Sequence, residues 1–86
     1  MTHEPSLLNL PDDLPEHVYA SWIGALTDLR ESSTPALVNE HQQFCTAYLQ
    51  ALEDVQAIDP HMARMLHADV QVLSVAVRTL LNARLS

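Results

Sequence analysis

The chain has 86 residues, which is enough for one small domain with a modest core. It carries eleven acidic residues against four basic ones, all of them arginine, for a formal net charge of −7. Because Lys and Arg supply most of the affinity for phosphate backbones, this charge argues against direct binding of DNA or RNA.

Hydrophobic residues make up 48% of the chain but include only one Trp, two Tyr and one Phe, so we expect an aliphatic core. The single cysteine, Cys45, has no partner for an internal disulfide. The sequence shows neither a secretion signal nor an apolar run long enough to span a membrane. We therefore expect a cytoplasmic protein without membrane association, and its lysine-free, alanine-rich composition suggests a GC-rich bacterial source.

Residues 1–13 are predicted to form an N-terminal arm. Pro5, Pro11 and Pro15 punctuate this stretch, and the residue before each proline is pushed toward extended conformations. The leucines of the arm are compatible with packing over the chain's own core or with docking into a groove.

The first helix is expected over residues 14–31. Asp13 and Glu16 have the spacing of a capping box, and Pro15 falls in the first turn, where its missing N–H costs nothing. Apolar residues then recur at helical spacing until a polar cluster at residues 31–34. They are Val18, Trp22, Ala25, Leu26 and Leu29.

Two further helices are expected over residues 35–57 and 60–85. Each follows a capping residue and a first-turn proline, Thr34 with Pro35 and Asp59 with Pro60. The short connection predicts that they form an antiparallel hairpin. The valines of the last segment are also compatible with a buried strand, but the sequence offers no partner strand. The predicted fold is an all-α, antiparallel three-helix bundle, made of this hairpin and the shorter first helix.

Apolar residues cover well over half the circumference of the third helix. Its polar residues fall on one narrow stripe, which we interpret as its exposed edge: Arg64, His67, Gln71, Ser74, Arg78 and Asn82. A helix at the edge of a monomer needs an apolar arc of only about 100°, so this helix needs cover on two or three sides. Because it is the longest helix, its far end, residues 77–85, is predicted to extend beyond the first helix and remain partly bare.

We therefore predict an interaction surface on the third helix that a second copy of the chain or another protein covers. Its predicted residues are Leu66, Leu73, Val77, Leu80, Leu81 and Leu85. The alternative is a monomer whose other two helices provide all the cover.

A buried polar cluster is predicted from His41, Cys45, Tyr48 and Asp69. Asp69 lies within the apolar arc of the third helix, where an unpaired carboxylate is costly. If the hairpin turns near residues 58–59, Tyr48 lies opposite Asp69, so a hydroxyl-to-carboxylate hydrogen bond is expected.

No catalytic or cofactor signature appears, and the histidines lack the spacing of a zinc site. We therefore expect no enzyme activity, cofactor or resident metal. The hypothesis is a non-enzymatic interaction protein, of the kind represented by small regulators, antiactivators, secretion chaperones and immunity proteins. The rival hypothesis is a dimeric bundle that holds a small ligand or metal among the four polar residues.

Overall fold

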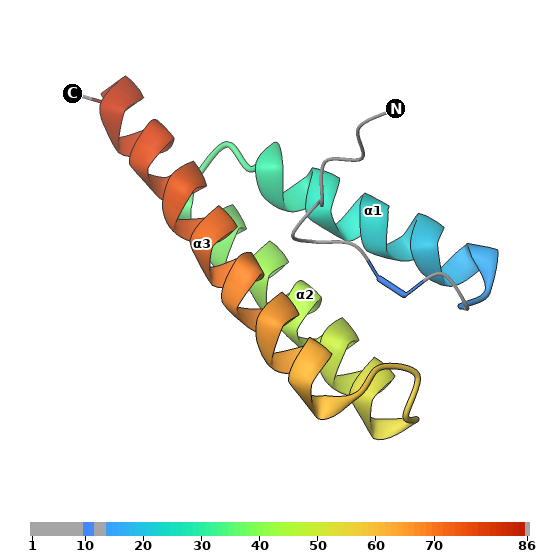
Figure 1. Cartoon of the computed structure of the whole chain (residues 1–86). Helices are drawn as coiled ribbons and strands as arrows, with labels where there is room; N and C mark the ends of the chain where they lie inside the picture. Colours follow the sequence, from blue (N-terminus) through green and yellow to red (C-terminus); the bar gives the residue numbers. More distant parts are fainter. Residues whose placement is uncertain (1–9, 12–13, 86) are drawn as a thin grey trace, which may run out of the picture.

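The computed structural model describes residues 10–11 and 14–85, and this part of the chain folds into three helices (Figure 1). They are α1 (Glu16–Arg30), α2 (Pro35–Asp54) and α3 (Pro60–Leu85). The predicted all-α three-helix bundle is therefore confirmed. The segment that was also compatible with a strand is helical, and the described residues contain no strand. Residues 1–9 and 12–13 of the predicted arm lie outside the described part.

The start of α1 differs from the predicted one. Pro15, with φ −58° and ψ 148°, is the N-cap residue, and no side chain of the described residues caps the helix. The carbonyl of Pro15 instead accepts a hydrogen bond from the N–H of Val18 at 3.0 Å. The expectation that Pro15 occupies the first turn was wrong by one position, and Asp13 lies outside the described residues.

The caps predicted for the other two helices are confirmed. The Thr34 hydroxyl accepts a hydrogen bond from the Leu37 N–H at 3.1 Å, and Pro35 opens α2. The Asp59 carboxylate accepts one from the Met62 N–H at 2.7 Å. Each side chain satisfies an N–H that has no partner within the first turn of its helix.

The connection between α2 and α3 begins with a Schellman motif, so α2 ends at Asp54, three residues earlier than predicted. Gln56 has a φ of 61°, in the left-handed region. Its N–H donates to the Glu53 carbonyl at 2.9 Å, and the Ala57 N–H donates to the Leu52 carbonyl at 2.8 Å. These are the two bonds that define the motif. The chain then reverses, and α2 and α3 lie side by side and antiparallel (Figure 1).

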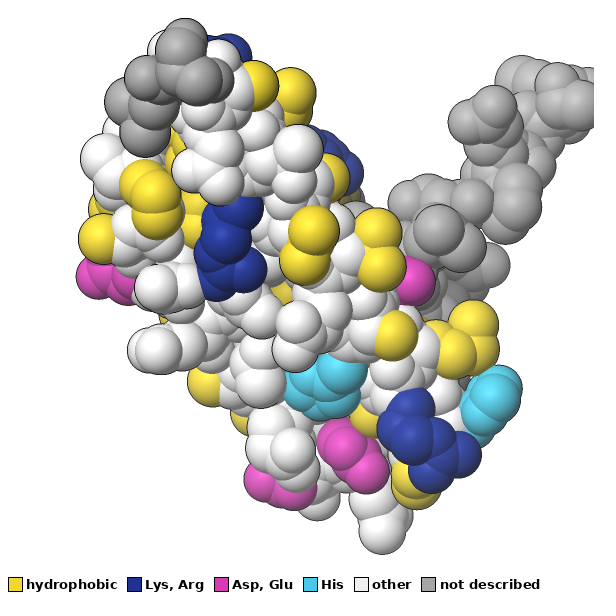
Figure 2. Space-filling view, turned by 90° about the vertical axis from the view of Figure 1, so that its left-hand side faces the viewer, with side chains coloured by type: hydrophobic (Ala, Val, Ile, Leu, Met, Phe, Trp, Pro, Cys, Tyr) yellow, Lys and Arg dark blue, Asp and Glu magenta, His cyan; other side chains and the backbone are white. Residues whose placement is uncertain are grey.

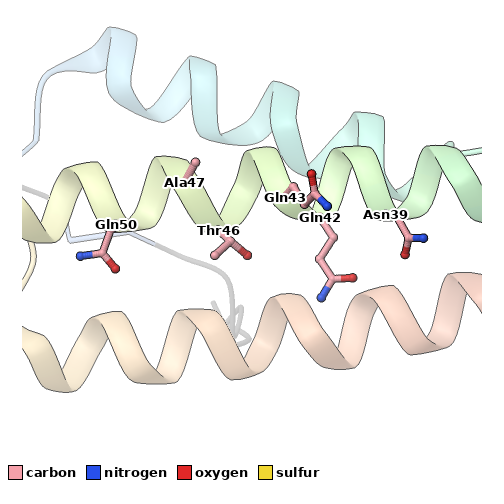
Figure 3. A pocket seen from close by; sticks show the side chains of 6 residues that line it. All are labelled: Asn39, Gln42, Gln43, Thr46, Ala47 and Gln50. Carbon is pink, nitrogen blue, oxygen red and sulfur yellow. The ribbon is translucent and has the colours of Figure 1, made fainter.

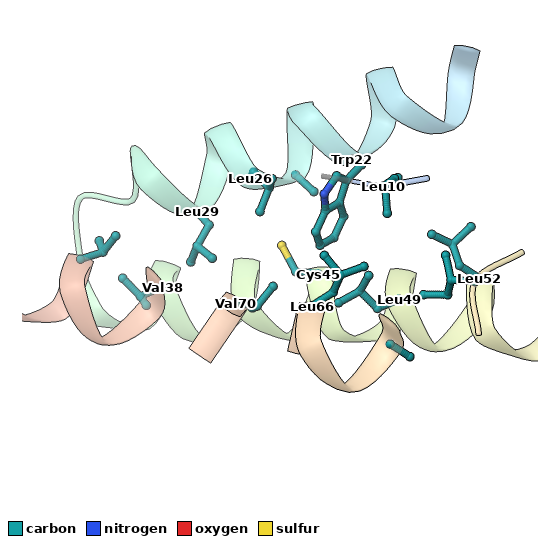
Figure 4. Packing of buried hydrophobic residues seen from close by; sticks show 14 of the residues in the cluster. Leu10, Trp22, Leu26, Leu29, Val38, Cys45, Leu49, Leu52, Leu66 and Val70 are labelled. Carbon is teal, nitrogen blue, oxygen red and sulfur yellow. The ribbon is translucent and has the colours of Figure 1, made fainter. Parts of the chain in front are cut away.

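The core lies where α1 packs across this hairpin (Figure 4). All three helices contribute side chains that are almost fully buried, among them Trp22, Leu29, Val38, Leu49, Leu66 and Val70. Leu10, which precedes α1, also belongs to this cluster. At this one position, the predicted arm therefore packs over the chain's own core.

Candidate interaction surface on α3

The structure separates the six residues predicted to form the interaction surface. Leu66, Val77 and Leu81 are buried in the chain's own core, and Leu73 is partly buried against it. Leu80 is 63% exposed. Leu85 ends α3, and its side chain lies outside the described part. The predicted surface was therefore wrong for Leu66, Val77 and Leu81, because these side chains are already covered within one chain.

The far end of α3 is not bare on its inner side. The start of α2 and the connection that precedes it lie against this end, although α1 does not extend so far (Figure 1). Ser33, Thr34 and Pro35 line a small hollow of about 290 Å³ together with Leu81 and Arg84. The lengths of the helices alone do not predict this cover, because the connection before α2 provides it.

The predicted polar stripe is the exposed edge of α3 only in part: Arg64, Gln71 and Asn82 are exposed, whereas His67 and Arg78 are partly buried. Ser74 is fully buried, and its hydroxyl donates to the Val70 carbonyl of the same helix at 2.8 Å. The Arg78 guanidinium reaches across to α2, where it donates to the side-chain oxygens of Asn39 and of Gln42. Around Ser74 and Arg78, α3 therefore packs beside α2.

The side of α3 that faces away from the core is largely apolar. Met65 is 51% exposed, Val72 67% and Val75 57%. Ala68, Ala76 and Thr79 are exposed on the same side of the helix. We call the stripe formed by Met65, Ala68, Val72, Ala76 and Thr79 the outward face of α3. Figure 2 shows separate hydrophobic side chains on this side of the molecule, surrounded mainly by uncharged surface.

Four of the seven large apolar side chains that are most exposed belong to α3. The other three are Ile23 on α1, Phe44 on α2 and Val55 at the end of α2. Singly exposed apolar residues are ordinary on a protein surface, whereas their accumulation on one helix favours association. The outward face of α3 is therefore the strongest candidate surface.

The predicted polar cluster of His41, Cys45, Tyr48 and Asp69 does not form the expected hydrogen bond. The Tyr48 hydroxyl donates to the Val18 carbonyl of α1 at 3.1 Å, and so the predicted bond to Asp69 was wrong. One carboxylate oxygen of Asp69, Oδ2, is buried without a hydrogen-bond partner in the described part of the chain, as is the Tyr19 hydroxyl. The position of α1, which the sequence does not fix, determines where Tyr48 finds its acceptor.

Cys45 is buried in the core and has no free access to solvent. Burial, with a smaller contribution from the negative charge of Asp28, raises the pKa of its thiol from 9.0 to about 11. Nucleophilic cysteines have lowered pKa values, because the thiolate is the reactive form. Cys45 therefore has the character of a structural core residue.

Tyr48 is also the middle ring of an aromatic stack between α1 and α2. Its ring centroid lies 6.0 Å from that of Trp22 and 6.1 Å from that of Phe44, with interplanar angles of 11° and 20°. The stack runs from the buried indole of Trp22 to the exposed ring of Phe44. Such ring pairs add to the burial energy and fix the position of α1 on the hairpin.

A hollow of about 500 Å³ runs along α2 (Figure 3). Its lining consists of Asn39, Gln42, Gln43, Thr46, Ala47 and Gln50. Amides, a hydroxyl and a methyl group can form hydrogen bonds and packing contacts, but they supply neither a general acid nor a general base near neutral pH. None of the four residues of the predicted polar cluster lines it.

Among the described residues, no group of three or more His, Cys, Asp or Glu side chains is arranged to hold a metal ion. Within the same residues, no helix has the length and apolar character of a membrane span. No known protein family, curated protein or solved structure matches the chain.

Proposed function

We propose that this protein is a non-enzymatic interaction protein that binds another protein surface through the outward face of α3. The observation that carries the proposal is the exposure of Met65, Val72 and Val75 along one helix that the chain leaves uncovered. Because these side chains are 51–67% exposed, leaving each of them in water forgoes roughly half of the 1.5–3 kcal/mol of full burial, or about 1–2 kcal/mol. A partner that covers the stripe recovers this energy.

The charge of the chain supports an apolar docking mode. Through Ile58 the sequence has nine acids and one Arg, whereas from Asp59 onward it has two acids and three Arg. The acidic part of the chain favours solubility and discourages nonspecific contacts, while the nearly neutral α3 segment permits close approach. Small regulators, antiactivators, secretion chaperones and immunity proteins act in this way, and we propose a cytoplasmic role of this type.

The rival hypothesis of a bound ligand or metal receives less support from the geometry. Tyr48 uses its hydroxyl to position α1, and Cys45 is enclosed by apolar side chains of the core. Asp69 retains one buried oxygen without a partner among the described residues, but it does not line the hollow along α2 or those beside Pro60 and Pro35. No specific observation therefore favours this second function.

The test is comparative affinity capture from the source cells. Tagged wild type, Val72→Glu and Ile23→Glu are used, because both sites are exposed β-branched residues within a helix, 67% and 62% respectively. We expect Val72→Glu to lose the specifically retained protein and Ile23→Glu to keep it, with equal melting temperatures for all three. Retention by Val72→Glu at the wild-type level would contradict the proposal.

A further inference from the structure

α1 is held to the rest of the molecule differently from the other two helices. It crosses the α2–α3 hairpin at an angle, whereas α2 and α3 lie side by side (Figure 1). Its buried residues, from Trp22 to Leu29, pack on the hairpin, and the Tyr48 hydroxyl donates to the Val18 carbonyl at 3.1 Å. The opposite side of α1 is exposed. α1 therefore docks on the hairpin through one side.

The hairpin is held together toward both ends by contacts that do not involve α1. At one end, the Schellman motif around Gln56 and the Asp59 cap of α3 hold the turn. Toward the other end, the Arg78 guanidinium of α3 donates to the side-chain oxygens of Asn39 and Gln42 on α2. None of these hydrogen bonds has to break when α1 departs.

Three features within α1 favour its departure. No side chain of the described residues caps its start, whereas Thr34 and Asp59 cap α2 and α3. Gly24 lowers the helix propensity at its middle, and a Cβ there would meet no atom within 4 Å, so packing does not require glycine. The Tyr19 hydroxyl is buried without a hydrogen-bond partner in the described part of the chain, and departure returns it to water. A helix of 15 residues is marginal in isolation, so α1 unfolds when it leaves.

We propose that α1 is a hinged lid, which leaves an intact α2–α3 hairpin in the native protein and exposes the apolar inner face of the hairpin. The side chains beneath α1 include Leu49, Leu66 and Val70, all buried in the closed state (Figure 4). The hinge is the connection of residues 31–34, between α1 and α2. The inference does not rest on the proposed function, because the outward face of α3 points away from this core.

The chain carries its own probe of this opening. Cys45, its single cysteine, is fully buried and points from α2 toward α1 (Figure 4). Burial and the negative charge of Asp28 on α1 both raise the pKa of its thiol, from 9.0 to about 11. Departure of α1 removes both causes. The open state therefore contains a reactive thiol, whereas the thiol of the closed state is protected.

The first test is the rate at which an aromatic disulfide reagent labels Cys45 at urea concentrations below the unfolding midpoint. While this rate is proportional to the reagent concentration, it reports the population of the open state. Opening of α1 exposes only part of the buried surface. We therefore expect the logarithm of the rate to rise with urea at about half the slope of global unfolding or less. A slope equal to that of global unfolding would overturn the inference.

Three variants separate the opening of α1 from global unfolding. Tyr48→Phe removes the hydrogen bond to α1 and should raise the labelling rate about 5-fold. Gly24→Ala favours the helical, docked form and should lower the rate about 3-fold. Asp59→Ala removes a cap that the open state retains, so it should lower the urea midpoint and leave labelling without urea unchanged. If Asp59→Ala raises the rate as much as Tyr48→Phe does, labelling requires global unfolding and the inference is wrong.

Hydrogen exchange followed by mass spectrometry gives an independent measurement. After correction for intrinsic rates, we expect the amides of α1 to exchange at least about 10-fold faster than those in the centres of α2 and α3. Asp59→Ala should accelerate exchange in α2 and α3 and leave exchange in α1 unchanged. Equal protection of all three helices would show that they unfold as one unit, and the proposed lid would then be refuted.

Discussion

Replacing Gln56 by glycine is expected to stabilise the protein. Gln56 has a φ of 61° in the Schellman motif that ends α2. A left-handed conformation costs an L-residue about 1–2 kcal/mol, whereas glycine adopts it freely. Glycine also has a larger conformational entropy in the unfolded chain, and this entropy offsets about 0.5–1 kcal/mol of that gain in stability. The side chain of Gln56 is exposed, so little packing is lost. The net gain in the free energy of unfolding is therefore roughly 0.5–1 kcal/mol.

The assay is urea denaturation followed by far-UV circular dichroism, together with thermal melting. For a domain of this size, the gain corresponds to a rise in melting temperature of roughly 2–8 °C. Gln43→Gly is the matched control, because Gln43 is exposed within α2. There, glycine should cost roughly 0.5–1 kcal/mol. Loss of stability in Gln56→Gly equal to that in Gln43→Gly would refute the role assigned to the turn.

Three further substitutions test the core. Tyr48→Phe removes the hydrogen bond to the Val18 carbonyl and should lower the free energy of unfolding by about 0.5–1.5 kcal/mol in urea denaturation, whereas an unchanged value would show that the bond is dispensable. The pKa of Cys45 is raised from 9.0 to about 11, so the folded state holds its proton more tightly than the unfolded state. Stability should therefore decline as pH rises from about 9 to 11, and Cys45→Ala should decline less over this window than wild type. Leu29→Ala, at a fully buried site, should lower the free energy of unfolding by about 2–5 kcal/mol. Its surface control, Leu80→Ala, at a site 63% exposed, should lower it by less than about 1 kcal/mol. Similar urea midpoints for the two variants would contradict the described packing.

The features that were predictable from the sequence are those with local causes. Thr34 with Pro35 and Asp59 with Pro60 define helix starts within four residues of chain, and both are confirmed. The end of α2 was harder to predict, because the left-handed position of the Schellman motif holds Gln56 and not the usual glycine. Without that signal, the apolar periodicity of α2 appeared to continue to residue 57.

The residues predicted to form a surface on α3 divide between two sides of the helix: Leu66, Val77 and Leu81 are buried, whereas Leu80 is exposed. A serine and an arginine in the polar stripe suggested exposure. However, Ser74 satisfies its hydroxyl on its own helix, and Arg78 extends to the amides of α2. Hydrophobicity alone did not distinguish the inward side of α3 from the outward side, since both are rich in valine and alanine.

The aromatic stack gives the protein a built-in spectroscopic reporter. Trp22 is the single tryptophan of the chain, and its indole is buried against Tyr48 of the hairpin. Its emission therefore responds to whether α1 is docked, while circular dichroism responds mainly to the helices themselves. If α1 leaves the hairpin before α2 and α3 separate, the fluorescence transition will precede the dichroic one. The order of the two transitions thus measures how strongly the shortest helix is coupled to the hairpin that carries the outward face.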